Sequence, residues 1–175
     1  MKSDLSLWQF GGFTLSFIGG SLLHFLYNWT NKSIFVAPFS AVNESTWEHM
    51  KLLFFPMFIF AVIQSFFFKD FENFWAVKLT GILTGLILIP VLFYTLSGIF
   101  GKYPDWINIA IFFISAAVSY IIETHLLKFG FRTGIPNIFS LIIIITIGIL
   151  FAVFTFLTPQ LPIFKDPLTS TYGLK

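Results

Sequence analysis

The 175-residue chain has no cysteine and little charge. Without cysteine, it can form neither a disulfide framework nor a metal site built from thiolates. Charged residues make up 10% of the sequence, whereas soluble domains carry about 25%. The net charge of +2 is too small to indicate a nucleic-acid partner, so we expect none.

The N-terminus also lacks the features of a cleavable signal peptide. Residues 1–7 are polar and only weakly basic, and the long apolar run that follows has no clear small-residue cleavage site near its end. Apolar residues, in contrast, are abundant: they make up 57% of the chain, and the mean hydropathy is +0.87. A soluble fold of this length could not bury so much apolar surface, whereas a bilayer can accommodate it.

Five apolar runs are long enough to cross a membrane, which takes roughly 20 residues in a helix. They cover residues 8–29, 46–68, 74–100, 106–127 and 138–157. All five tryptophans lie at the ends of these runs, where amphipathic rings prefer the membrane interface. The sequence therefore predicts an all-α integral membrane bundle of about five transmembrane helices. It forms a single domain over residues 1–175, with an irregular, proline-containing tail at 158–175.

Basic residues are evenly divided between the two sides of this topology. Five lie on the N-terminal side, including Lys69 and Arg132, and five on the other, including Lys175. Because Lys175 lies far from a span, the positive-inside rule favours an N-terminus inside. We expect a multi-pass protein of a cell membrane, of the bacterial cytoplasmic type, that contacts lipid. A homo-oligomer is compatible with the sequence.

Small and polar residues recur at every fourth position in parts of three spans. In the first span these positions are Gly12, Ser16, Gly20 and His24; in the third, Gly81 and Gly85; in the fourth, Ser115, Ser119 and Glu123. Such stripes let helix backbones approach each other, so His24 and Glu123 should point into the bundle. The Gly81–Gly85 pair either packs a neighbouring helix or forms a dimer interface.

The densest polar stretch leads directly into the second span and reads Val42-Asn43-Glu44-Ser45-Thr46-Trp47-Glu48-His49-Met50-Lys51. Ionisable groups at the mouth of a membrane helix are candidates for a functional site. Ser45 to Glu48 matches a capping box, so Glu48 is either a helix cap or a site residue, and it could also pair with Lys51. No capping rule explains His49.

His24 and His49 should lie at similar depth on adjacent antiparallel helices, because the first span ends where the second begins. Two imidazoles with Glu44 or Glu48 would suit zinc or another divalent metal, and the remaining carboxylate could act as a base. The chain has no H-E-x-x-H motif, and Glu48 and His49 point about 100° apart on a helix. Further candidates are Tyr94 as a stabiliser and, for substrate binding, Asn43, Trp47, Tyr27 and Asn108.

Two other features leave alternatives open. The apolar segment 34–42, with Pro38 at its centre, is either a re-entrant loop or a surface loop packed on the bundle. On the opposite membrane side, Glu123, His125 and Lys78 form a second candidate group. In a purely structural interpretation, Glu123 pairs with Lys78, and His125 complements the C-terminal end of its helix.

The motif His24-x-x-Tyr27-x-Trp29, followed by the stretch from Val42 to Lys51, resembles an uncharacterised family of small multi-pass bacterial membrane proteins. The resemblance extends over most of the chain, and residues 24–51 are its specific part. It implies a class of protein and no reaction. Ceramidase-like hydrolases, which hold zinc between membrane helices, offer an analogy only, because this chain lacks their paired-histidine spacing and has fewer spans.

Three functions are consistent with these features. The first is a metal-dependent hydrolase in the membrane that acts on a lipid or hydrophobic substrate. The second is a small transporter or solute-binding subunit, in which Glu123 marks the far end of a pathway. The third is a non-catalytic structural or interaction protein.

Overall fold

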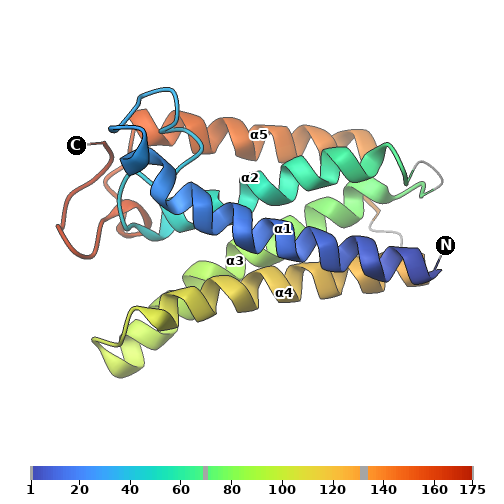
Figure 1. Cartoon of the computed structure of the whole chain (residues 1–175), viewed down its shortest axis with the longest axis horizontal. Coiled ribbons are helices and arrows are strands. Elements are labelled where there is room, and N and C mark those ends of the chain that lie inside the picture. The colour runs from blue at the N-terminus through green and yellow to red at the C-terminus, as the bar shows by residue number, and fades with distance from the viewer. Residues whose placement is uncertain (1, 69–70, 131–133, 175) are drawn as a thin grey trace.

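The computed structural model describes residues 2–68, 71–130 and 134–174, so Lys69, Arg132 and Lys175 of the charge count lie outside it (Figure 1). The described residues form five long helices: α1 (Lys2–Trp29), α2 (Thr46–Ser65), α3 (Phe74–Phe100), α4 (Trp106–Phe129) and α5 (Asn137–Phe156). Each is long and apolar enough to span a membrane. The prediction of an all-α bundle with five membrane helices is confirmed.

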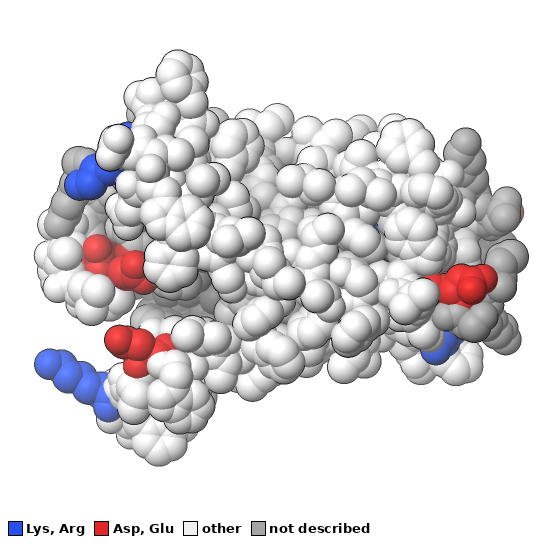
Figure 2. All heavy atoms as spheres, in the orientation of Figure 1, with Lys and Arg blue, Asp and Glu red and all other residues white. Residues whose placement is uncertain are grey.

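The helices alternate in direction, so the N- and C-termini lie at opposite ends of the bundle (Figure 1). The ends of α1, α3 and α5 meet the starts of α2 and α4 at one end, which we call the cleft end. Figure 2 shows that the charged side chains visible on this face gather at the two ends, with an uncharged belt between them. This distribution matches a bilayer, whose core excludes charge.

Helix α2 is the central element. In its most apolar window, 61% of the residues are buried, against 22% to 39% in the other helices. Leu53, Phe54 and Ala61 of α2 are fully enclosed, and α2 contacts every other helix. The start of α2 is therefore fixed from several sides, which positions the polar residues there.

The glycine pair of α3 packs against α4. A methyl group at Gly81 would collide with the carboxylate of Glu123, and one at Gly85 would collide with the hydroxyl of Ser119. Of the two alternatives, packing against a neighbouring helix is the one observed. These glycines are buried and therefore offer no surface to a second copy of the chain.

The segment between α1 and α2 folds back onto both helices through a series of turns. The Ser40 hydroxyl accepts a hydrogen bond from the Tyr27 amide at 2.9 Å and donates one to the carbonyl of Leu23. Phe39 reaches the ring of Phe55, more than two turns inside α2, with 5.0 Å between centroids. The segment is thus packed on the bundle, and its depth in a bilayer stays a prediction.

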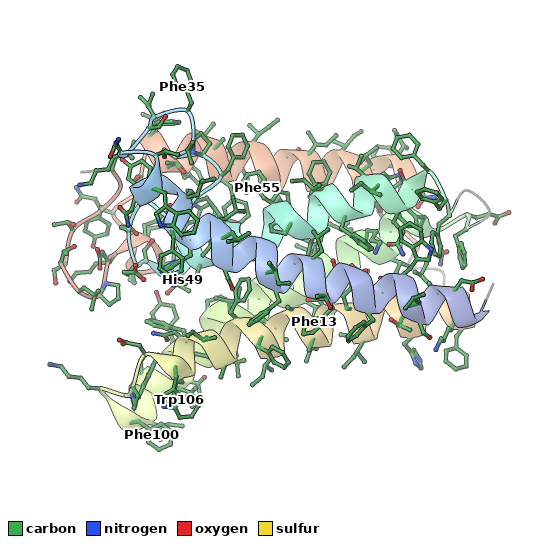
Figure 3. The ribbon with its side chains drawn as sticks, in the orientation of Figure 1. Phe13, Phe35, His49, Phe55, Phe100 and Trp106 are labelled. Carbon is green, nitrogen blue, oxygen red and sulfur yellow. The ribbon has the colours of Figure 1, made fainter. Side chains whose placement is uncertain are left out.

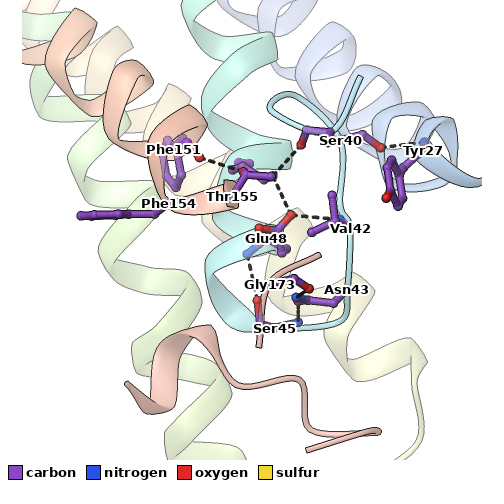
Figure 4. A network of polar contacts seen from close by, with 12 residues as sticks. Tyr27, Ser40, Val42, Asn43, Ser45, Glu48, Phe151, Phe154, Thr155 and Gly173 are labelled. Carbon is purple, nitrogen blue, oxygen red and sulfur yellow. Dashed lines mark hydrogen bonds and ion pairs between the residues drawn. The ribbon is translucent and has the colours of Figure 1, made fainter. Parts of the chain in front are cut away.

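A buried lysine ties this segment to α2 and α5. Lys51 Nζ lies 2.6 Å from Glu48 Oε2 and donates to the Ala37 carbonyl at 3.0 Å and to Thr155 Oγ1 at 2.9 Å. The Val42 amide donates to the same Glu48 oxygen at 3.0 Å. Figure 4 shows Glu48, Val42 and Thr155 converging beside the start of α2.

The tail after α5 returns across the cleft end rather than leaving the bundle. It contains a short 3-10 helix, η1 (Pro162–Phe164), and Phe164 packs on Trp47 with 4.6 Å between ring centroids. Asn43 Nδ2 donates to the Gly173 carbonyl at 3.1 Å. The tail predicted as irregular is therefore held against the start of α2 (Figure 4).

Candidate metal centre in a cleft

A cleft of about 480 Å³ opens at the cleft end of the bundle. It is lined by residues of α1 to α4, by Glu44 in the loop before α2, and by Pro167 and Leu168 of the tail. The hollow is visible in Figure 2 between two groups of acidic side chains. In Figure 3, His49 lies above it, and Phe100 and Trp106 mark the splayed tip of the α3–α4 hairpin below it.

His24, Glu44 and His49 meet at the mouth of this cleft, and we call these three residues the two-histidine cluster. Glu44 lies between the imidazoles: its Oε1 is 3.7 Å from His24 Nε2, and its Oε2 is 3.5 Å from His49 Nε2. One ligand atom from each residue can be chosen so that all lie within 4.8 Å of one another. Tetrahedral zinc with bonds near 2.1 Å separates its ligand atoms by about 3.4 Å, so small side-chain movements suffice for coordination.

A hydrogen bond orients the His49 ring for this role. His49 Nδ1 lies 2.9 Å from the Ser45 carbonyl, which can only accept, so Nδ1 carries the proton. In the neutral ring, Nε2 then presents its lone pair to Glu44 and His24. A backbone carbonyl that fixes the tautomer of a histidine is the usual support of a metal ligand.

Asp166 of the tail adds a carboxylate behind the cluster. It is 5% exposed, faces the backbone amide of Glu44 and lies close enough to His49 to interact with it electrostatically. Burial favours a higher pKa for Asp166, but hydrogen bonds from the Thr169 hydroxyl and from the Leu168 and Thr169 amides outweigh it and hold its pKa below the usual range. Asp166 therefore stays ionised beside the loop that carries Glu44.

Of the other residues predicted for this site, Asn108 lines the cleft, where its side chain accepts a hydrogen bond from Tyr103 at 3.2 Å. Glu48 points away from the cluster, because neighbouring helix positions diverge, and its carboxylate is bound by Lys51 and Val42. It also does not complete the capping box, since the Ser45 amide donates to Asn43 Oδ1 instead.

Four further candidates lie apart from the cluster, and none lines the cleft. Asn43 bonds Ser45 and the tail, and Trp47 packs on the α5 side against Phe151. Tyr27 is buried beneath the loop, and Tyr94 is 42% exposed on α3. Their roles as substrate-binding or catalytic groups stay predictions.

The second candidate group is a buried ion pair. Lys78 Nζ lies 2.5 Å from Glu123 Oε2, and both side chains are almost completely enclosed. The rings of Phe60, Phe74 and Tyr120 surround the ammonium at 5.6–5.9 Å. The predicted Lys78–Glu123 pair is present, whereas His125 is exposed and packs against Phe129 with tilted rings and centroids 4.5 Å apart.

Two acidic residues of the cleft region were not among the predicted site residues. Asp105 lines the cleft at the start of α4, and its side chain makes no capping bond there. The Asp166-Pro167 pair signals a turn, as the hydrogen bonds to Leu168 and Thr169 show. No local signal, however, indicates that this turn docks beside Glu44.

Comparison with known proteins gives a family and no reaction. No curated protein and no solved structure matches the chain. A family model, described as a family of unknown function (DUF6512), matches residues 1–174. This agrees with the resemblance to an uncharacterised family noted in the sequence. The five-helix protein with its two-histidine cluster belongs to DUF6512, a family of unknown function.

Proposed function

We propose that the two-histidine cluster binds a divalent metal ion, zinc being the best match, and that the protein is a membrane-embedded, metal-dependent hydrolase of a lipid or other hydrophobic substrate. The observation that carries this proposal is the convergence of three ligand atoms within 4.8 Å at the mouth of a 480 Å³ cleft. Clefts of this size suit small-molecule ligands. Catalytic zinc sites commonly use three protein ligands and leave one position open.

The residues around the cluster suit hydrolysis. A zinc ion bound there would supply an activated water and polarise a carbonyl group. His49 is held in the required tautomer by Ser45, and Asp166 supports Glu44 from the tail. Asp105 and Asn108, from the other side of the cleft, could orient a substrate, and the Asp105 carboxylate could accept a proton. Glu48 has no part in this scheme, because its carboxylate is bound elsewhere.

A transporter is the less favoured alternative. It would need an open polar path from the cluster to the Lys78–Glu123 pair, but neither Lys78 nor Glu123 lines the cleft, and the buried hydroxyls of Ser16 and Tyr120 between them bond each other. Between them α1 packs tightly: a methyl group at Gly12 would collide with Phe60 and Tyr120, and one at Gly20 with Phe112. This packing favours a closed site that opens at one end only.

Location and orientation are part of the same proposal. With five spans in a bacterial cytoplasmic membrane and the N-terminus inside, the cleft would open towards the outer face. Cysteine accessibility tests this directly in the cysteine-free chain: a cysteine at exposed Lys102, beside the cleft, should react with an impermeant thiol reagent on intact cells. Reaction only after the cells are opened would place the cleft inside.

The hydrolase proposal is tested with a chromogenic lauroyl ester and the purified, zinc-loaded protein in detergent. We expect hydrolysis that a chelator abolishes and that zinc restores. His49→Ala should remove it, and His125→Ala, which changes an exposed histidine at the opposite end, should not. Hydrolysis that persists in the chelated protein or in the His49 variant would contradict the proposal.

A further inference from the structure

The cleft changes in character along the membrane normal. The polar groups of His24, Glu44 and His49 stand at its mouth. Deeper in the bundle its lining is apolar: Phe17 on α1, Leu52 on α2, Ile89 on α3, and Ile111 and Phe112 on α4. A molecule that fills this space needs a polar head at the membrane surface and an apolar part that points towards the bilayer centre.

The apolar part of the cleft is short. Phe17 lies seven residues before His24 on the same helix, a distance of about 10 Å along the helix axis. Below this level the rings of α1 and α4 close the space, since Phe13 and Phe17 lie 5.2 and 5.4 Å from Phe113 between centroids. A 480 Å³ space of this depth is large enough for an alkyl chain of medium length together with its head group.

The walls above these rings are open to lipid. Phe25 of α1 is 49% exposed and Ile109 of α4 is 61% exposed, and both line the cleft. Apolar side chains that both line a cleft and face the bilayer allow a chain to enter sideways from the membrane. Ser21, also exposed and lining the cleft, lies one turn below Phe25 on the same wall.

The charges of the lining restrict the head group. Glu44 and Asp105 are the charged residues among those that line the cleft, both are acidic, and Asp166 adds a third carboxylate nearby. The lining contains no lysine or arginine among the described residues, and its two imidazoles face Glu44, so a phosphate would meet mainly negative charge. Neutral and amine-bearing head groups avoid this repulsion.

We propose that the cleft binds a single-chain amphiphile with a neutral or amine-bearing head group, its head at the two-histidine cluster and its chain against Phe17 and Phe112. The metal contact of the head rests on the proposed function, whereas the chain site does not. Binding of the chain can therefore be measured in the metal-free protein.

The test uses decanol with a photoreactive diazirine at the far end of its chain. In chelated protein, irradiation should label the peptides that contain Phe17 or Phe112, and mass spectrometry locates the label. Unlabelled decanol and decylamine should compete, and decyl phosphate should compete less. Ser21→Trp should fill the cleft and so reduce the labelling of the peptides that contain Phe17 or Phe112 about tenfold, the equivalent of about 1.4 kcal/mol. Leu22→Trp is the matched control, because Leu22 is 52% exposed and does not line the cleft.

Labelling confined to lipid-facing residues, or unchanged by Ser21→Trp, would overturn the chain site. Competition by decyl phosphate as strong as that by decylamine would overturn the head-group assignment. Helix content by circular dichroism and an elution volume in gel filtration equal to those of the wild type show that the Ser21→Trp variant is folded. A second probe carries the same chain and diazirine but a hydroxamate head group, which binds zinc. It should label the peptides that contain Phe17 or Phe112 more strongly when zinc is present. Failure of this step alone would contradict the metal site and leave the chain site standing.

Discussion

Lys51 Nζ lies 2.6 Å from Glu48 Oε2. This buried ion pair holds the Glu48 carboxylate away from the two-histidine cluster, although the next residue in the chain, His49, belongs to that cluster. Both side chains face the loop and α5, where Ala37 and Thr155 complete the bonds of the lysine. The motif before and within α2 thus serves two purposes. Glu44 and His49 form the cluster, and Glu48 and Lys51 fasten the loop that carries Glu44.

Lys51→Met should strongly destabilise the protein. It leaves the buried Glu48 carboxylate without its cation, and breaking a buried pair in this way costs about 3–5 kcal/mol. Unfolding in a denaturing detergent measures the loss. The double change Lys51→Met with Glu48→Gln should recover part of it, because no charge is then left unpaired. Lys102→Met, at an exposed position, is the control and should have little effect.

Glu48→Gln should leave zinc affinity within about threefold of the wild type, since its carboxylate does not reach the cluster and the new amide oxygen can still accept the bonds from Lys51 and Val42 that hold the loop. Glu44→Gln, which removes a ligand with the same change of charge, should weaken zinc binding by at least about a hundredfold. Isothermal titration of both folded variants makes the comparison. Equal losses would show that the assignment of the two glutamates is wrong.

Gly81→Ala should destabilise the α3–α4 contact, because its methyl group would collide with Glu123 and disturb the pair with Lys78. We expect a loss of about 1–3 kcal/mol from overpacking. Gly98→Ala is the matched control on the same helix: no atom lies within 4 Å of its added carbon, and alanine favours a helix. Similar stabilities of the two variants would contradict the packing described for this glycine pair.

Asp166→Asn should lower zinc affinity about tenfold while the five helices persist, as expected for a group that supports a metal ligand. Zinc titration gives the affinity, and circular dichroism gives the helix content. Asp105→Asn makes the same charge change at another acidic residue of the cleft region and should leave the affinity nearly unchanged. A larger effect of the Asp105 change would argue that Asp105 is the ligand.

The lowered pKa of Asp166 predicts how docking of the tail depends on pH. A carboxyl group with a depressed folded pKa stabilises the docked tail above its unfolded pKa, and this contribution is lost as the pH falls through the folded value. Protease cleavage within the tail should therefore stay slow at neutral pH and accelerate only below about pH 4. Asp166→Asn should show faster cleavage at neutral pH and no such acid step.

The sequence predicts the helices because membrane spans follow from apolar length alone. It also predicts that His24 and His49 meet, because counting turns inward from one shared loop gives their depth. Helix rotation is harder to predict: Trp47 turns to α5, Tyr94 turns outward, and Glu48 reaches Lys51. Asp166 could not be placed at all, since its position depends on a tail that folds back through long-range contacts with Asn43 and Trp47.

The most direct test of the central claim is the zinc content and zinc affinity of the purified full-length chain, measured for the wild type and for single alanine substitutions of its three histidines. We predict about one zinc per chain in the wild type and in His125→Ala. In His24→Ala and His49→Ala, binding should weaken by at least about a hundredfold. Absence of stoichiometric metal from the wild type under non-chelating conditions, or equal binding by all three variants, would contradict the account.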